Sequence, residues 1–154
     1  MARVLNLLIV ILEISGFSKS LKKHSIKKSF VYYTQISNLL TLISSALLVI
    51  FGRREFIEVL RLVSVSMMIM TFFVTACILV PMSRKPKEML FSGSGLFHHL
   101  LIPVLSTATY LLAEKKAPFG FAFIAPLVTL IYGLLMLYLN NKKRVEGPYP
   151  FFMI

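Results

Sequence analysis

Four stretches of this sequence contain no Lys, Arg, Asp or Glu, and each is about as long as a helix that crosses a lipid bilayer. They cover residues 30–51, 62–82, 96–113 and 119–139. Roughly 20 mostly apolar residues are needed to cross the hydrocarbon core, which is about 30 Å thick. Because exposed backbone groups find no partner in lipid, a crossing segment has to satisfy them internally. Each stretch is therefore predicted to be a transmembrane helix.

A fifth apolar stretch, residues 4–20, follows Arg3 and contains Glu13. A basic start before a short apolar stretch is also typical of a secretory signal peptide. The glutamate argues against that interpretation, and no small-residue cleavage motif follows Ser15. We therefore predict a fifth transmembrane helix. The expected fold class is all-α, a polytopic membrane helix bundle that occupies residues 1–154 as one domain.

The composition supports this class and argues against a soluble nucleic-acid-binding protein. Apolar residues make up 57% of the chain, against about 45–50% in ordinary soluble domains. The 17 Lys and Arg residues and the 6 Asp and Glu residues lie mainly between the apolar stretches. A net charge of +11 would suit nucleic acid if the basic residues formed one face. We expect membrane lipids around this chain and no nucleic-acid partner.

Neither a metal nor a cofactor is expected. Cys77 is the single cysteine, so the chain has no intrachain disulfide and no cysteine metal cluster. Haem held by two histidines needs imidazoles that face each other from two helices. His98 and His99 are neighbours on one predicted helix, and His24 lies in a lysine-rich loop. Zinc would lack both a cysteine pair and an acidic partner at ligand spacing.

The basic residues also predict the orientation in the cell membrane. Eleven Lys and Arg residues fall in segments 18–29, 83–95 and 141–154, whereas six, including Arg61, fall on the side of the N-terminus. Cytoplasmic loops carry the excess of Lys and Arg. We expect the N-terminus outside and the C-terminus in the cytoplasm, with a cysteine at Glu114 open to reagents from outside.

Three prolines are expected to shape the helices. Pro118 lies near the start of the last stretch, where a proline suits the first turn of a helix. Pro103 and Pro126 lie inside their stretches. We expect them to kink their helices and to free carbonyl groups that neighbouring polar side chains must satisfy.

Polar residues recur at steps of three and four along the stretches, which places them on one helical face. In residues 30–51 they are Thr34, Ser37, Asn38, Thr41 and Ser45. Such faces commonly pack membrane helices together. We assign most of the Ser and Thr residues to that role, Thr71 and Thr75 of the third predicted helix included.

Glu13, Asn38 and His99 are interpreted differently. A carboxylate or an imidazole within a membrane span is costly enough to suggest a function. His99 continues the polar face of its stretch, whereas His98 is rotated by about 100° and shares its side with leucines. We therefore expect His99 to be the histidine that faces the interior.

Four motifs carry a resemblance to a known family. They are residues 30–40 (FVYYTQISNLL), 97–103 (FHHLLIP), 132–133 (YG) and 147–152 (GPYPFF). In this order they resemble a group of bacterial multi-pass integral membrane proteins. That group is similar to the animal androgen-induced and androgen-dependent membrane proteins, which hydrolyse fatty acid esters of hydroxy fatty acids with an intramembrane threonine and a histidine.

The resemblance implies both a site and a helix count. Thr34 matches the family threonine, and the histidine is either His98 or His99, depending on which spacing to Pro103 is used. Members of the group usually have six spans, whereas this chain ends directly after Phe152, where the last helix would begin. We expect a truncated sequence, or a five-span form that associates with a second copy or retains bound lipid.

The leading functional hypothesis is an intramembrane threonine hydrolase of a lipid ester. Thr34 would attack the acyl carbon and His99 would accept its proton, while Asn38 or helix N-terminal amides stabilise the oxyanion. A further residue has to orient the histidine, and the candidates are Glu13, Tyr132 and Tyr149. The alternatives are a transporter, channel or ligand-binding protein, favoured by Glu13 and the two histidines, or a structural membrane protein.

Overall fold

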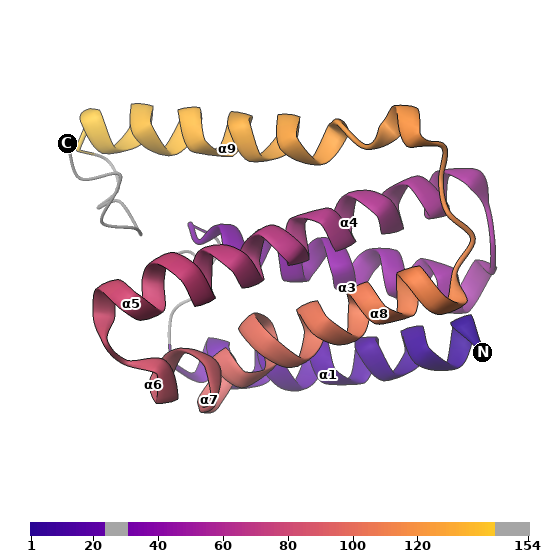
Figure 1. Cartoon of the computed structure of the whole chain (residues 1–154), viewed down its shortest axis with the longest axis horizontal. Helices are drawn as coiled ribbons and strands as arrows, with labels where there is room; N and C mark the ends of the chain where they lie inside the picture. The colour runs from indigo at the N-terminus through magenta and orange to yellow at the C-terminus, as the bar shows by residue number, and fades with distance from the viewer. Residues whose placement is uncertain (24–30, 144–154) are drawn as a thin grey trace.

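The protein is a bundle of helices in this computed structural model, which describes residues 1–23 and 31–143. Five segments of the described chain are long and apolar enough to cross a membrane. Their main helices are α1 (Ala2–Lys23), α3 (Tyr33–Phe51), α4 (Glu55–Val74), α8 (Ile102–Ala113) and α9 (Ile124–Asn141). The described residues form no strand, so the predicted all-α bundle is confirmed (Figure 1).

Two of the spans change their helical pitch along their length. The third span passes from α4 through the π-helical turn η1 (Thr75–Leu79) into α5 (Val80–Ser83). The fourth begins with α7 (Gly93–Gly95) and the π-helical turn η2 (Leu96–Leu101), and it continues as α8. The short helix α6 (Pro86–Leu90) lies between the two spans.

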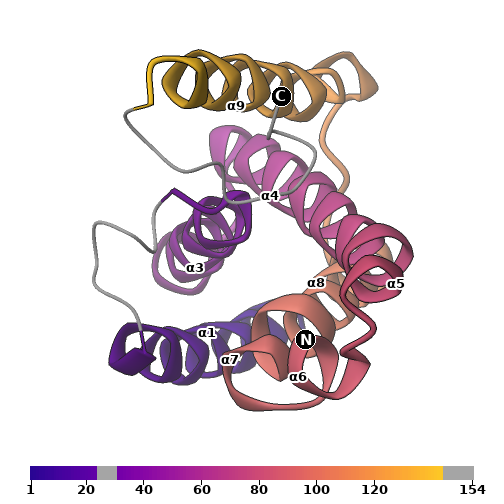
Figure 2. The same ribbon diagram turned by 90° about the vertical axis from the view of Figure 1, so that its left-hand side faces the viewer.

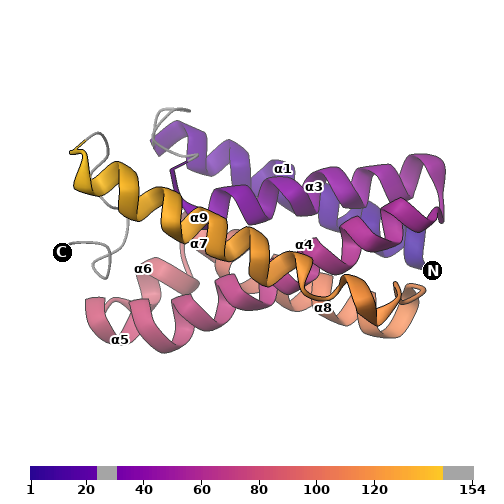
Figure 3. The same cartoon turned by 90° about the horizontal axis from the view of Figure 1, so that it is seen from above.

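Four helices form a ring, and the fifth lies outside it. Helix α1 contacts α3 and α8, and α4 contacts the same two helices. The view along the bundle shows this ring, with α9 beyond α4 (Figure 2). Helix α9 crosses over α4 (Figure 3). It is the least buried of the five spans, with only 11% of its length inside the protein. The site therefore has to be sought within the ring and at its border with α9.

The interior of the bundle is polar and its outer surface is apolar. The largest side chains with almost no exposed surface include Arg61, His98, Glu13, Asn6 and Asn38. Large apolar side chains are exposed along every span. Lipid solvates apolar surface, whereas polar groups removed from water need protein partners. This distribution is the one expected of a bundle that crosses a membrane.

The third span begins earlier than the apolar pattern predicted. Helix α4 starts at Glu55, two turns before residues 62–82, and Glu55 and Glu58 lie in its first turn. Carboxylates are favourable there because the N-terminus of a helix carries a partial positive charge. The sequence pattern placed Arg61 in a loop, but it lies in a helical segment long and apolar enough to cross a membrane.

Two predictions about prolines are wrong. The last span begins at Ile124, after a single 3-10 turn at Phe119–Phe121, so Pro118 precedes the helix instead of opening it. Pro126 lies in the first turn of α9. An N–H in the first turn has no partner within the helix, so Pro126 breaks no helical hydrogen bond and need not kink the helix.

Residues 147–152, including Tyr149, lie outside the described residues. The position at which a sixth span was expected to begin lies there too. The role proposed for Tyr149 and the sixth span therefore both stay predictions.

Candidate functional site

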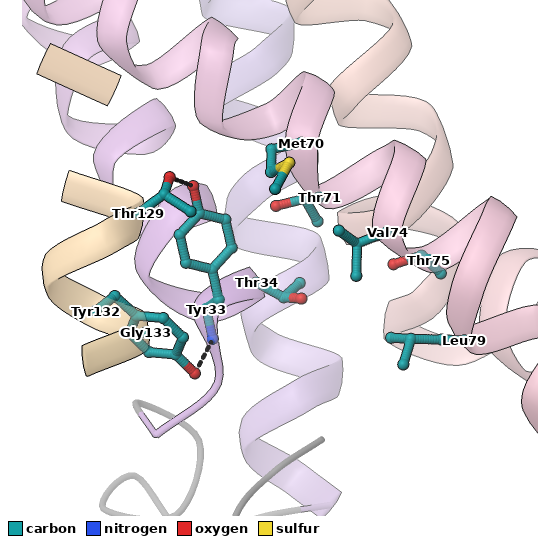
Figure 4. A pocket seen from close by; sticks show the side chains of 10 residues that line it. All are labelled: Tyr33, Thr34, Met70, Thr71, Val74, Thr75, Leu79, Thr129, Tyr132 and Gly133. Carbon is teal, nitrogen blue, oxygen red and sulfur yellow. Dashed lines mark hydrogen bonds between the residues drawn. The ribbon is translucent and has the colours of Figure 1, made fainter. Parts of the chain in front are cut away.

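A small pocket lies where α3, α4 and α9 meet (Figure 4). Its volume is about 130 Å³. Its apolar walls come from Met70, Val74 and Leu79. Four threonines also line it, namely Thr34, Thr71, Thr75 and Thr129. Met70 is 44% exposed, so the pocket borders the surface that faces lipid. Thr34, the predicted nucleophile, therefore lies in an apolar cavity at the membrane-facing side of the ring.

Two tyrosines close the pocket on the side of α9. The Tyr132 hydroxyl donates to the Val31 carbonyl at 2.7 Å and accepts from the Tyr33 N–H at 3.1 Å. The Tyr33 hydroxyl lies 2.7 Å from Thr129 Oγ1. These contacts attach α9 to the start of α3. Tyr132, proposed from the sequence to orient the histidine, thus lines the pocket while its hydroxyl bonds to the backbone at the start of α3.

The hydroxyl groups of the pocket differ in whether they are already hydrogen-bonded to other side chains. The Ser37 hydroxyl donates to the Thr34 carbonyl at 3.0 Å and lies 2.9 Å from Thr71 Oγ1. Because Ser37 has already used its proton, Thr71 has to donate to Ser37. Among the described residues, no side chain hydrogen-bonds the Thr34 hydroxyl, which faces the pocket. Thr34 is therefore free to interact with a ligand, whereas the Thr71 hydroxyl already donates to Ser37 on α3.

The histidine expected at the site contacts a different threonine from the one predicted. His99 Nδ1 lies 2.9 Å from Thr75 Oγ1. Thr75 is 2% exposed and also lines the pocket. A hydroxyl within hydrogen-bond distance of an imidazole nitrogen is the geometry of an activated nucleophile and its base. The structure thus pairs His99 with Thr75, a residue that sequence reasoning assigned to packing.

Both members of this pair lie in π-helical turns, and each turn is followed by a proline. Thr75 opens η1 and Pro81 follows that turn, while His99 lies in η2 and Pro103 follows it. A proline inside a helix removes one N–H and clashes with the carbonyl four residues earlier. A wider turn relieves that clash. The prolines therefore explain why the helices widen where the pair is formed.

Asn38 satisfies a carbonyl group that Pro103 leaves without a donor. In η2 the Ile102 N–H donates to the Phe97 carbonyl, five residues earlier. In the same register the donor for the His98 carbonyl would be residue 103, which has no N–H. Asn38 Nδ2 donates to this carbonyl at 3.5 Å and to the Thr34 carbonyl at 2.7 Å. The freed carbonyl that was expected at Pro103 is therefore that of His98, and Asn38 connects η2 to α3.

The prediction that His98 faces the leucine side is wrong. Its side chain is 1% exposed, and Nδ1 lies 3.4 Å from Gln35 Nε2 while Nε2 lies 3.7 Å from Glu13 Oε2. The wider turn of η2 changes the direction of side chains from that in an α-helix. Glu13, another predicted site residue, therefore lies beside His98, which belongs to a separate buried cluster.

A second polar centre lies toward the N-terminal end of the bundle. Arg61 Nη2 lies 2.9 Å from Glu114 Oε1, and the two side chains are 0% and 3% exposed. Asn6 also donates to this carboxylate at 2.9 Å. The remaining guanidinium protons go to hydroxyls on α3 and α8, namely Ser44, Ser45 and Ser106. Glu114 is therefore not the open loop position that the sequence suggested.

Sequence reasoning missed Arg61 and Thr75 for different reasons. Arg61 borders an apolar stretch, so its charge suggested a loop residue. The serines on one face of α3, such as Ser45, were the available signal of a buried partner. Thr75 follows Thr71 by one helical turn and resembles packing residues. The proline six positions after Thr75 was the available signal that the helix widens there.

In the described part of the chain, no group of three or more His, Cys, Asp or Glu side chains is arranged to hold a metal ion. Comparisons of the chain with protein-family models, with curated proteins and with solved structures found no match. The geometry of this site is therefore the observation from which a function is inferred.

The ion pair yields a stability prediction. Arg61→Ala should lower the free energy of unfolding by about 3–5 kcal/mol, because the Glu114 carboxylate would remain buried without its charged partner. Denaturant unfolding in mixed micelles, followed by circular dichroism, measures this change. Arg54→Ala is the matched control, since Arg54 is exposed and its loss should cost less than about 0.5 kcal/mol. Equal effects of the two substitutions would contradict the role of Arg61.

Proposed function

We propose that this protein is an intramembrane hydrolase that cleaves a lipid ester, with Thr75 as nucleophile and His99 as base. The observation that carries the proposal is the 2.9 Å contact between Thr75 Oγ1 and His99 Nδ1 at a small apolar pocket. The resemblance to the threonine-dependent membrane hydrolases points to the same chemistry but names Thr34. The hydrogen bond favours Thr75 for the attack, because a nucleophile needs its base within reach.

The proposed reaction needs only groups that this chain supplies, together with water. His99 accepts the Thr75 proton at Nδ1 while Thr75 Oγ bonds to the acyl carbon of the ester. Thr34 faces the same pocket with a free hydroxyl, which can donate to the oxyanion. The protonated His99 then gives its proton to the leaving alcohol. Water, deprotonated by His99, finally attacks the acyl-threonine. The bond from the acyl carbon to Thr75 Oγ breaks, His99 returns the proton to Oγ, and the fatty acid leaves.

The pocket and its position favour a lipid as the substrate. A volume of about 130 Å³ holds a reacting group and not a whole lipid, so the rest of an acyl chain would lie along the exposed side of Met70. Long-chain esters partition into the bilayer, and they would reach this site without entering water. Asn38 is less suited to the oxyanion than we expected, because its amide N–H groups already donate to two backbone carbonyls.

Threonine substitutions test the chemistry. Thr75→Ala and His99→Ala should each abolish hydrolysis of a fluorogenic long-chain ester by the protein in lipid nanodiscs. The double variant should be little worse than either single variant, because residues that act as one unit are not additive. Thr34→Ala should lower kcat by about 10²–10³-fold, as the loss of one oxyanion donor does.

Thr107→Ala is the matched control, because the Thr107 hydroxyl donates to the Pro103 carbonyl of its own helix and, among the described residues, to no group of the pocket. It should keep full activity. Loss of activity in Thr34→Ala with normal activity in Thr75→Ala would move the nucleophile to Thr34. Absence of ester hydrolysis in the unchanged protein, with no labelling by a lipophilic fluorophosphonate, would remove the hydrolase proposal.

We also propose that the protein lies in the cell membrane with its N-terminus outside. Because Arg61 is buried and paired with Glu114, it does not belong in the loop count. Subtracting it from the six basic residues of the N-terminal side leaves five against eleven, which strengthens the bias. Association with a second copy, or retention of lipid against α9, stays a prediction.

Cysteine labelling tests this orientation. Once the exposed Cys77 is replaced by Ala, a cysteine at Lys116 should react with a membrane-impermeant thiol reagent in intact cells. A cysteine at Lys22 should react only after the cells are opened, because it would face the cytoplasm. Both positions are exposed, so burial would not explain a difference. The reverse labelling pattern would refute the orientation.

A further inference from the structure

The proposed reaction does not use the buried cluster around Glu13. This cluster consists of Glu13 on α1, Gln35 and Asn38 on α3, and His98 in η2. Glu13 and Asn38 are 0% exposed, His98 is 1% and Gln35 is 8% exposed. His98 joins the cluster, since its ring lies 3.7 Å from Glu13 and 3.4 Å from Gln35, and its carbonyl accepts from Asn38.

The cluster holds more hydrogen-bond acceptors than donors. Four buried oxygens in it have no hydrogen-bond partner, namely both carboxylate oxygens of Glu13, Gln35 Oε1 and Asn38 Oδ1. Most of the donors are already used: Gln35 Nε2 donates to Ser20 Oγ at 3.1 Å and approaches His98 Nδ1, and Asn38 Nδ2 donates to two carbonyls. His98 Nε2, on the side of Glu13, has no partner and is a single donor against these four oxygens. The amide of Asn38 cannot be turned over, because its oxygen would then face those carbonyls.

The charge of Glu13 is also not balanced by a close partner. The distance of 3.7 Å to His98 Nε2 is longer than the 2.7–3.2 Å of a protein hydrogen bond. Lys19, one turn and a half along α1, has its Nζ over the Phe97 ring at 4.4 Å. A buried, unpaired carboxylate is costly enough that proteins neutralise it.

A proton and a cation would neutralise Glu13 in different ways. A proton on the carboxyl group adds one donor and leaves at least one of the two amide oxygens without a partner. A cation takes several oxygen ligands at once, so one ion in this cluster could be bound by carboxylate and amide oxygens together. Carboxylate and amide oxygens suit hard cations such as Na⁺ or Ca²⁺. One carboxylate balances a single positive charge, which favours a monovalent ion.

The backbone is shaped to bring these groups together. A Cβ atom at Gly16 would clash with His98 Nε2, so only glycine lets the imidazole approach α1 this closely. The Phe17 ring packs against the same imidazole with centroids 5.0 Å apart. The close approach of η2 to α1 is therefore a built feature of this end of the bundle.

We infer that Glu13, Gln35 and Asn38 bind a monovalent cation, of which Na⁺ is the probe, beside His98 in the centre of the ring. This site is independent of the proposed hydrolase pair, because it uses neither Thr75 nor His99. Bound Na⁺ connects α1 to α3 and stabilises the folded state.

Thermal unfolding in lipid nanodiscs tests the inference directly. At fixed pH and ionic strength, replacing choline by Na⁺ should raise the unfolding midpoint, by roughly 3–5 °C for each tenfold increase in Na⁺ above the Kd. Glu13→Gln should remove this dependence, because the neutral amide keeps the size of the side chain and loses the charge. Glu88→Gln is the matched control, since the Glu88 side chain is 69% exposed, and it should keep the full dependence.

Asn38→Ala provides a second variant in case Glu13→Gln does not fold, and it should shift the midpoint curve to higher Na⁺ concentrations. A midpoint that changes with pH but not with Na⁺ would assign the cluster to a proton and overturn the inference. A Na⁺ response that persists in Glu13→Gln would overturn it as well. Ester hydrolysis that is normal in choline would show that the two sites are separate and would leave the hydrolase proposal intact.

Discussion

The bundle depends on one constraint: every polar group that it removes from water needs a partner inside the protein, because lipid offers none. The two ends of the ring meet this constraint differently. Toward the N-terminus, the Arg61 guanidinium is bonded to Glu114 and to hydroxyls on two helices. Toward the opposite end, the cluster around Glu13 retains oxygens without partners. The end at Arg61 leaves the buried Asn6 Oδ1 without a partner, whereas the cluster around Glu13 leaves four such oxygens, and unpartnered buried groups are where a function is expected.

Prolines connect this constraint to the proposed chemistry. Pro81 and Pro103 each follow a π-helical turn, and these turns carry Thr75 and the two histidines. In regular α-helices the neighbouring imidazoles would point about 100° apart, one inward and one toward lipid. In the wider turn, His98 faces Glu13 while His99 reaches Thr75. The same local distortion therefore positions both histidines, one at the proposed hydrolase pair and one at the proposed cation site.

The sequence predicted the fold far better than the site. Uncharged stretches of about 20 residues are sufficient to locate transmembrane helices, because the thickness of the bilayer sets their length. Apolar patterns cannot show that Arg61 is drawn into the bundle by Glu114, since that pair forms only when distant segments meet. The π-turns were equally hidden, because periodicity assumes a constant pitch. For this reason the periodicity places Thr34 on a buried face, as the structure does, but turns His98 toward the leucines instead of toward Glu13.

The central claim is that Asn38 satisfies the His98 carbonyl, which Pro103 leaves without a backbone donor. It is tested most directly by a double-mutant cycle between Asn38→Ala and Pro103→Ala, with unfolding free energies measured in mixed micelles. Asn38→Ala alone should cost about 1–3 kcal/mol, because the His98 carbonyl loses its donor. With alanine at position 103, a backbone N–H returns, so the cost of Asn38→Ala should fall by about 1 kcal/mol or more. The same cost of Asn38→Ala in both backgrounds would contradict the account.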